Sequence, residues 1–139
     1  GGHEYSAVIE HIGTGVDPSL FHIGDKVINY IIDDCGVCPD CKHHHENICS
    51  NFTKGTAYFN ENGFSGFYGF SEYAVVKARH LYVYPKETPD DEAAFTEPLA
   101  CVINSINRSH IKMGDDVVVI GGGVMGLLHE ATGGTRYLE

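Results

Sequence analysis

The chain has 139 residues, enough for one domain of ordinary size and little more. Its content of 42% hydrophobic and 20% charged residues is that of a folded protein, not a disordered one. A net charge of −10 argues against nucleic acid or an anionic membrane as partner, and no apolar run reaches the roughly 18 residues of a membrane helix.

The N-terminal third reads as short strands separated by glycine turns. Residues 5–12 are rich in β-formers and lead into Gly13-Thr-Gly15, and a second strand is expected at 26–31 after a Gly24-Asp25 turn. This succession predicts a small β-barrel and a mostly β fold with some helix.

A histidine and a glutamate, His3 and Glu4, stand at the entry to the first strand. The pair fits a polar cap on an edge strand. Taken alone, the two residues favour this structural reading.

Four cysteines, Cys35, Cys38, Cys41 and Cys49, follow in a short polar stretch that contains Gly36. Four thiolates complete a closed tetrahedral zinc site, and zinc binding would supply the folding energy that such a small lobe cannot obtain from an apolar core. We therefore predict a structural zinc site. Four cysteines at metal spacing and a lone Cys101 also fit the reducing cytoplasm better than a disulfide framework. We expect no leader peptide before the fold.

Other readings of these cysteines remain open at this point. Two disulfides would use the same four residues. The Cys-x2-Cys-x2-Cys spacing also begins a bacterial iron–sulfur run, but Cys49 comes too late for that run and Ser50 replaces its proline. His43, His44 and His45 are expected to be exposed loop residues, since four thiolates already fill the site.

The middle of the chain carries many aromatic residues. Most of those in 52–70 are expected to pack over the barrel rather than to line a substrate pocket. A short strand is predicted at 81–85, where Pro85 ends it.

Two helices are predicted next. Pro89 and three acidic residues suit the first turn of one helix. Pro98 should interrupt it, which places Glu97 at a break and starts a second helix at Pro98. That helix has one apolar face, formed by Leu99, Val102, Ile103 and Ile106, and Cys101 beside it is expected to be buried.

A glycine loop lies near the end, after an expected buried strand at 117–120. Gly121, Gly123 and Gly126 form a G-x-G-x-x-G pattern that runs into a helix start at Val124 and Met125. In this context the pattern indicates a dinucleotide-binding loop. The acidic residue that would separate NAD from NADP falls at or beyond residue 139.

The motifs Gly2-His3-Glu4, Cys35 to Cys49, Glu97-Pro98-Leu99 and Gly121 to Gly126 together resemble the medium-chain, zinc-dependent alcohol and polyol dehydrogenases. The resemblance covers roughly residues 1–129. It implies a GroES-like barrel with a four-cysteine zinc lobe and a strand within 69–76, followed by the first strand and glycine loop of a Rossmann domain.

The resemblance also implies a function. By this resemblance His3 would bind a catalytic zinc, with Glu97 as a further ligand and Glu4 as an alternative carboxylate ligand. The intact enzyme would oxidise a secondary alcohol, polyol or amino alcohol with NAD or NADP, and we expect it to be a cytoplasmic homo-oligomer that binds neither nucleic acid nor membrane.

We expect three regions: 1–110 as the GroES-like catalytic domain without its N-terminal part, 111–129 as the beginning of the dinucleotide-binding domain, and 130–139 as a non-native tail. The catalytic cysteine and proton-relay residues of relatives would precede residue 1, so this fragment should be inactive. A zinc-stabilised protein-interaction module and an iron–sulfur electron carrier are the alternatives.

Overall fold

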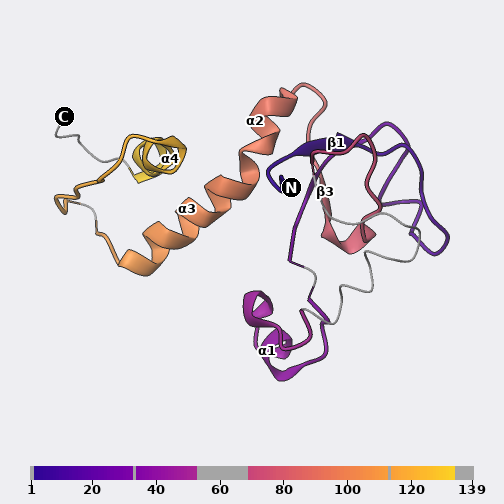
Figure 1. The fold of residues 1–139 in the computed structure, drawn as a ribbon, viewed down its shortest axis with the longest axis horizontal. Coiled ribbons are helices and arrows are strands. Elements are labelled where there is room, and N and C mark those ends of the chain that lie inside the picture. Colours follow the sequence, from indigo (N-terminus) through magenta and orange to yellow (C-terminus); the bar gives the residue numbers. More distant parts are fainter. Residues whose placement is uncertain (1, 33, 53–68, 113, 134–139) are drawn as a thin grey trace. The chain divides into compact units, whose positions relative to one another are not determined.

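The computed structural model describes residues 2–32, 34–52, 69–112 and 114–133 (Figure 1). The chain divides into two compact units, Gly1–Ala94 and Phe95–Glu139. Most of the aromatic stretch of the sequence, whose packing over the barrel was predicted, falls within 53–68 and so lies outside the described residues.

The first unit contains a three-stranded antiparallel sheet with strand order β1-β2-β3. The strands are β1 (Ser6–Val8), β2 (Lys26–Asn29) and β3 (Leu81–Val83). The register pairs Ala7 with Val27 and Ile28 with Tyr82. All three strands were predicted, but each is shorter than its β-rich segment.

The expected barrel is not closed within the described residues, where the sheet is open. Closure requires every strand to pair on both sides, and three strands of three or four residues are too few for that. The strand expected within 69–76 is also absent from the described structure, where this segment has no ladder partner. Helices hold more of the described residues than strands do, which corrects the mostly β prediction.

The turn before β2 forms as predicted. The Ile9 N–H donates to the Asp25 carbonyl (2.9 Å), and the Gly24 N–H donates to the Ile9 carbonyl (2.8 Å). These bonds continue the β1–β2 pairing, and Ile9 and Val27 are both buried.

Helix α2 (Asp90–Ala94) is held to the sheet by a polar cluster. Lys26 Nζ lies 2.7 Å from Asp90 Oδ1 and donates to the Thr88 carbonyl (3.2 Å), and the Tyr84 hydroxyl donates to the same Asp90 oxygen (2.9 Å). Because Lys26 begins β2 and Tyr84 follows β3, the cluster fixes the start of α2 against both strands.

The second unit begins with α3 (Thr96–Ser109). The predicted break at Glu97 is wrong: α2 ends at Ala94, and Glu97 and Pro98 lie in the first turn of α3. Proline is tolerated in this turn because its missing N–H would have no intrahelical partner there.

The apolar face of α3 is only partly buried. Val102 is fully buried, whereas Ile103 is 46% exposed. Cys101 is exposed, which corrects the prediction that it is buried. It lies on the side of α3 that carries Glu97, one turn earlier, and its Sγ is 3.9 Å from Glu97 Oε1.

Helix α4 (Val124–Gly133) starts at the end of the glycine loop and continues four residues into the segment 130–139, which was predicted to be a non-native tail. The strand expected at 117–120 does not form: Val118 is 69% and Ile120 96% exposed. A strand needs a hydrogen-bonded neighbour, and no described segment pairs with this one.

In the part of the chain that the structure describes, no helix is both long and apolar enough to cross a bilayer.

Candidate metal centre

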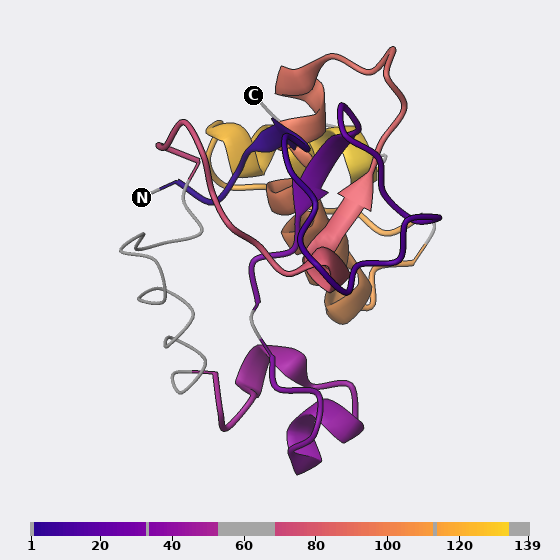
Figure 2. The same ribbon diagram turned by 90° about the vertical axis from the view of Figure 1, so that its right-hand side faces the viewer.

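The four predicted cysteine ligands are brought together by two very short helices, α1 (Pro39–Lys42) and the 3-10 helix η1 (Glu46–Ile48). Pro39 opens α1, where its missing N–H costs nothing. The Lys42 N–H donates to the Cys38 carbonyl (3.0 Å), so the chain turns within one helical turn and Cys41 comes back to Cys38. Figure 2 shows the helical turns of this lobe in magenta.

The sulfur atoms have the spacing of a tetrahedral metal site. The Cys38 and Cys41 sulfurs are 3.4 Å apart, the Cys35 and Cys41 sulfurs 3.9 Å, and the Cys38 and Cys49 sulfurs 3.9 Å. Zinc–sulfur bonds of about 2.3 Å in a tetrahedron give sulfur–sulfur edges of about 3.8 Å.

These distances also decide between the alternatives. All four sulfurs lie within 4.8 Å of one another, which leaves room for one ion at their centre and not for a multi-iron cluster. None of the described cysteines forms a disulfide. The donor set therefore fits a single zinc.

The sulfurs differ in their electrostatic surroundings. The Asn51 side chain donates to Cys35 Sγ (3.3 Å), as do the backbone N–H groups of Cys38 (3.3 Å) and Val37 (3.5 Å), and these contacts, with Asn51 first, lower the Cys35 pKa to about 6. Burial raises the Cys41 pKa to about 12. A buried thiol of this kind ionises readily only when a cation joins it, so metal binding should release protons.

The three consecutive histidines lie outside this sulfur group. His43, His44 and His45 are exposed, in agreement with the prediction that they are loop residues. The His44 Nδ1 lies 3.7 Å from a Glu46 carboxylate oxygen.

An anchor between the lobe and the sheet was not predicted. Arg79 donates through Nη2 to the backbone carbonyl of Asp34, and His80 Nε2 lies 3.7 Å from the Asp34 carboxylate. His80 is buried, its carbonyl accepts from the Tyr30 N–H (2.7 Å), and its ring meets the Tyr30 ring edge-on. No local pattern signals this anchor, because Asp34 and Arg79 are 45 residues apart.

The three predicted catalytic-zinc residues are divided between the two units. His3 and Glu4 are exposed and precede β1 in the first unit. Glu97 is half-buried in the first turn of α3, in the second unit. Their grouping at one metal ion remains a proposal.

Two positions of the glycine loop favour glycine on local grounds. Gly121 has φ +113°, a conformation that favours glycine, and a Cβ at Gly126 would collide with the Gly121 carbonyl oxygen. The Leu127 N–H donates to the Gly123 carbonyl (3.0 Å), which begins the ladder of α4. Val124 is 55% and Met125 42% exposed at this helix start.

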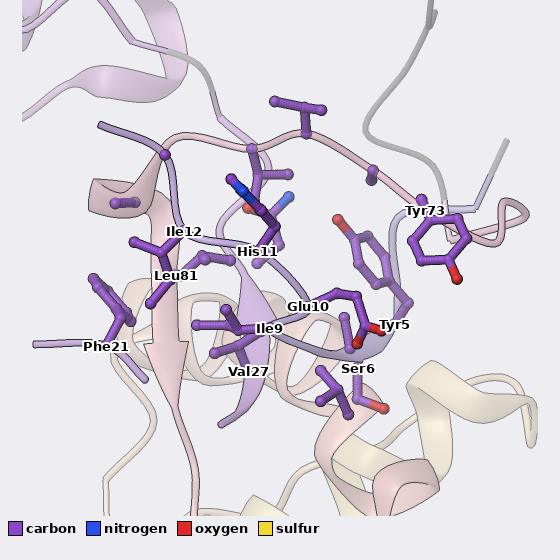
Figure 3. A pocket seen from close by; sticks show the side chains of 18 of the residues that line it. Tyr5, Ser6, Ile9, Glu10, His11, Ile12, Phe21, Val27, Tyr73 and Leu81 are labelled. Carbon is purple, nitrogen blue, oxygen red and sulfur yellow. The ribbon is translucent and has the colours of Figure 1, made fainter. Parts of the chain in front are cut away.

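The first unit also contains an open cavity of about 980 Å³ (Figure 3). Residues of β1 and its flanks line it, together with Phe21, Tyr73 and Leu81. Burial raises the pKa of Tyr5, one of the lining residues. None of the four clustered cysteines lines it, so the cavity and the metal centre are distinct sites.

Comparison with known proteins gives consistent matches. Residues 1–86 match the alcohol dehydrogenase GroES-like domain. Over 130 residues the chain is 37% identical to the sorbitol dehydrogenase of Halalkalibacterium halodurans, a match that covers 91% of this chain and 35% of that protein.

Solved structures of dehydrogenases also match this chain. A zinc-binding dehydrogenase from Clostridium scindens matches with a TM-score of 0.78 and 29% identity, over 91% of this chain and 33% of that one. A zinc-binding dehydrogenase from Sinorhizobium meliloti, bound to NADP, matches with a TM-score of 0.74 and 30% identity, over 91% and 34%. The chain thus spans about a third of the length of these relatives.

Proposed function

Because the chain belongs to the family of the alcohol dehydrogenase GroES-like domain, we propose that it forms part of a zinc- and NAD(P)-dependent oxidoreductase. The substrate would be a secondary alcohol, a polyol or an amino alcohol. The observation that carries this proposal is the similarity to a sorbitol dehydrogenase over nine-tenths of the chain, which favours a polyol.

Residues 1–110 would be the GroES-like catalytic domain and 111–129 the start of a Rossmann domain. Support for the second assignment is local: the glycine loop runs directly into α4, as at the first turn of a dinucleotide-binding unit. Residues 130–139 would lie outside the native fold, although α4 extends to Gly133.

Cys35, Cys38, Cys41 and Cys49 would hold a structural zinc. The closed set of four sulfurs at tetrahedral spacing supports a structural role, since it offers no position for a substrate. The lobe has few apolar side chains of its own to bury, so its folding would depend on the metal.

His3 and Glu97 would hold the catalytic zinc, with Glu4 as an alternative carboxylate ligand. The donor chemistry is suitable, because imidazole nitrogen and carboxylate oxygen are zinc ligands in catalytic sites. When bound, such a zinc acts as a Lewis acid on an alcohol oxygen. The first turn of α3 restricts the Glu97 side chain, and this would orient its carboxylate.

Gly121, Gly123, Val124, Met125 and Gly126 would receive the pyrophosphate of NAD or NADP. The bound cofactor supplies the hydride acceptor. The loop contributes backbone N–H groups at the start of α4, where the helix dipole favours an anion. The intact enzyme would be a cytoplasmic homo-oligomer that acts on a small-molecule alcohol.

The test is an assay of the intact enzyme that contains this sequence, with sorbitol, other polyols and L-threonine, following NAD⁺ or NADP⁺ reduction. His3→Ala and Glu97→Ala should each lower kcat/KM by about 100-fold or more, since residues that bind the metal directly matter at least as much as the partners that orient them. His22→Ala, which removes an exposed histidine, is the control. Absence of turnover on every alcohol, in protein with its full metal content, would refute the proposal.

A further inference from the structure

Asn51 contacts two of the four clustered cysteines through different groups. Its side-chain Nδ2 donates to Cys35 Sγ (3.3 Å), and its backbone N–H donates to Cys49 Sγ (3.4 Å). Cys35 and Cys49 are the first and last cysteines of the lobe, so one residue bridges the two ends of the loop.

The charge of the centre gives these contacts a function. Four thiolates carry four negative charges and zinc only two positive ones, so the filled centre keeps a net charge of −2 in a largely buried site. N–H donors directed at the sulfurs offset this excess, and partners of this kind orient and tune metal ligands.

Asn51 is half-buried and follows Cys49 by two residues, outside the ligand set itself. The other N–H donors to Cys35 belong to the backbone of Val37 and Cys38, which truncation of a side chain does not remove. A substitution of Asn51 can thus remove this side-chain donor while all four cysteine ligands stay in place.

We propose that Asn51 is a positioning residue of the metal centre. Its amide N–H sets the orientation and charge balance of the Cys35 thiolate, and its backbone N–H holds Cys49 in the same cluster. This proposal rests on the assignment of the four cysteines as a zinc site, and on no other part of the proposed function.

The experiment measures zinc transfer from the purified chain to a chromogenic chelator, for the wild type and for Asn51→Ala, Asn51→Asp and Asn51→Gln. Asn47→Ala is the matched control, because Asn47 is an exposed asparagine of the same lobe. We expect transfer from Asn51→Ala to be about 10- to 100-fold faster than from the wild type.

The order of the variants separates hydrogen bonding from packing. Aspartate has the size of asparagine, but it replaces the donor with a negative charge about as close to Cys35. If Asn51 acts through its N–H, Asn51→Asp should lose zinc faster than Asn51→Ala. Asn51→Gln, which keeps the amide, should lie between the wild type and Asn51→Ala. If Asn51 merely filled space, Asn51→Gln, with its longer side chain, would lose zinc at least as fast as Asn51→Ala, and that result would overturn the proposal.

A second readout is the visible and near-ultraviolet spectrum of the Co²⁺-loaded chain. Thiolate-to-cobalt charge-transfer bands should persist in Asn51→Ala with shifted energy, because four sulfurs remain bound while one loses its donor. Spectra and zinc transfer like those of Asn47→Ala would refute the role of Asn51. A wild-type chain that binds neither Zn²⁺ nor Co²⁺ would instead refute the zinc assignment on which the role depends.

Discussion

Gly126 has no room for a side chain. A Cβ there would overlap the Gly121 carbonyl oxygen and lie 3.0 Å from the Gly121 carbonyl carbon. The obstructing atoms belong to the backbone, so no side-chain rotation relieves the clash and either the loop or the first turn of α4 must move. Gly126→Ala is therefore a test of how tightly the glycine loop is bound to its helix.

The size of the effect is a balance of two terms. Alanine is favoured over glycine inside a helix by about 0.8–1 kcal/mol. Forcing a group into a filled space costs about 1–3 kcal/mol, and a contact with backbone should lie at the upper end. We expect a net loss of about 1–2 kcal/mol in the local stability of α4, which is a factor of about 5–30 in its opening equilibrium.

Native-state hydrogen exchange at the Leu127 N–H measures this opening directly, because that group donates to the Gly123 carbonyl in the first turn of α4. Gly122→Ala is the matched control, since nothing lies within 4 Å of a Cβ at that position. Protection of Leu127 in Gly126→Ala equal to that in the wild type, or equal loss in Gly122→Ala, would refute the reasoning.

Elemental analysis should find about one zinc per chain. Cys41→Ser should lose the metal and unfold the lobe, whereas Cys101→Ser, outside the cluster, should keep the metal and the folded lobe. Iron in place of zinc, or folded metal-free protein, would contradict this. Asp90→Asn should lower the thermal stability at neutral pH, because Lys26 and then Tyr84 lower the Asp90 pKa. The difference from the wild type should be complete above the ordinary carboxyl pKa of about 3.9 and vanish as the pH falls through the lowered value; a difference that persists in acid would argue for a packing effect. Calorimetric titration with NADH should show no binding to this chain, because the segment before the loop is exposed and unpaired within the described residues; micromolar affinity would contradict that expectation.

The parts of the fold that local chemistry determines were predictable. The strand positions follow from β-rich segments bounded by glycine and proline, and the Gly24–Asp25 turn forms as expected. The cysteine spacing led to a cluster whose geometry suits one zinc, because a short loop with four sulfurs has few ways to arrange them.

The errors concern features that depend on distant contacts. Residues 117–120 have the composition of a buried strand, but a strand forms only where a neighbour accepts its hydrogen bonds. Cys101 adjoins an apolar helix face in the sequence, yet its burial depends on what packs against that side of α3. The break between the two helices was predicted at Glu97, but α2 ends at Ala94 and α3 already starts at Thr96. The anchor of Asp34 by Arg79 joins segments too far apart for any spacing to reveal.

The open sheet has a consequence for the colloidal behaviour of this chain. Within the described residues β1 and β3 are its two edges, and Val8 (53% exposed) and Val83 (50% exposed) place apolar surface beside unpaired backbone groups. Such edges favour pairing between copies, whereas the net charge of −10 keeps copies apart. Salt shortens the range of that repulsion from about 30 Å at 0.01 M to about 8 Å at 0.15 M. Dilute buffer should therefore keep the chain dispersed, and added salt should drive its self-association.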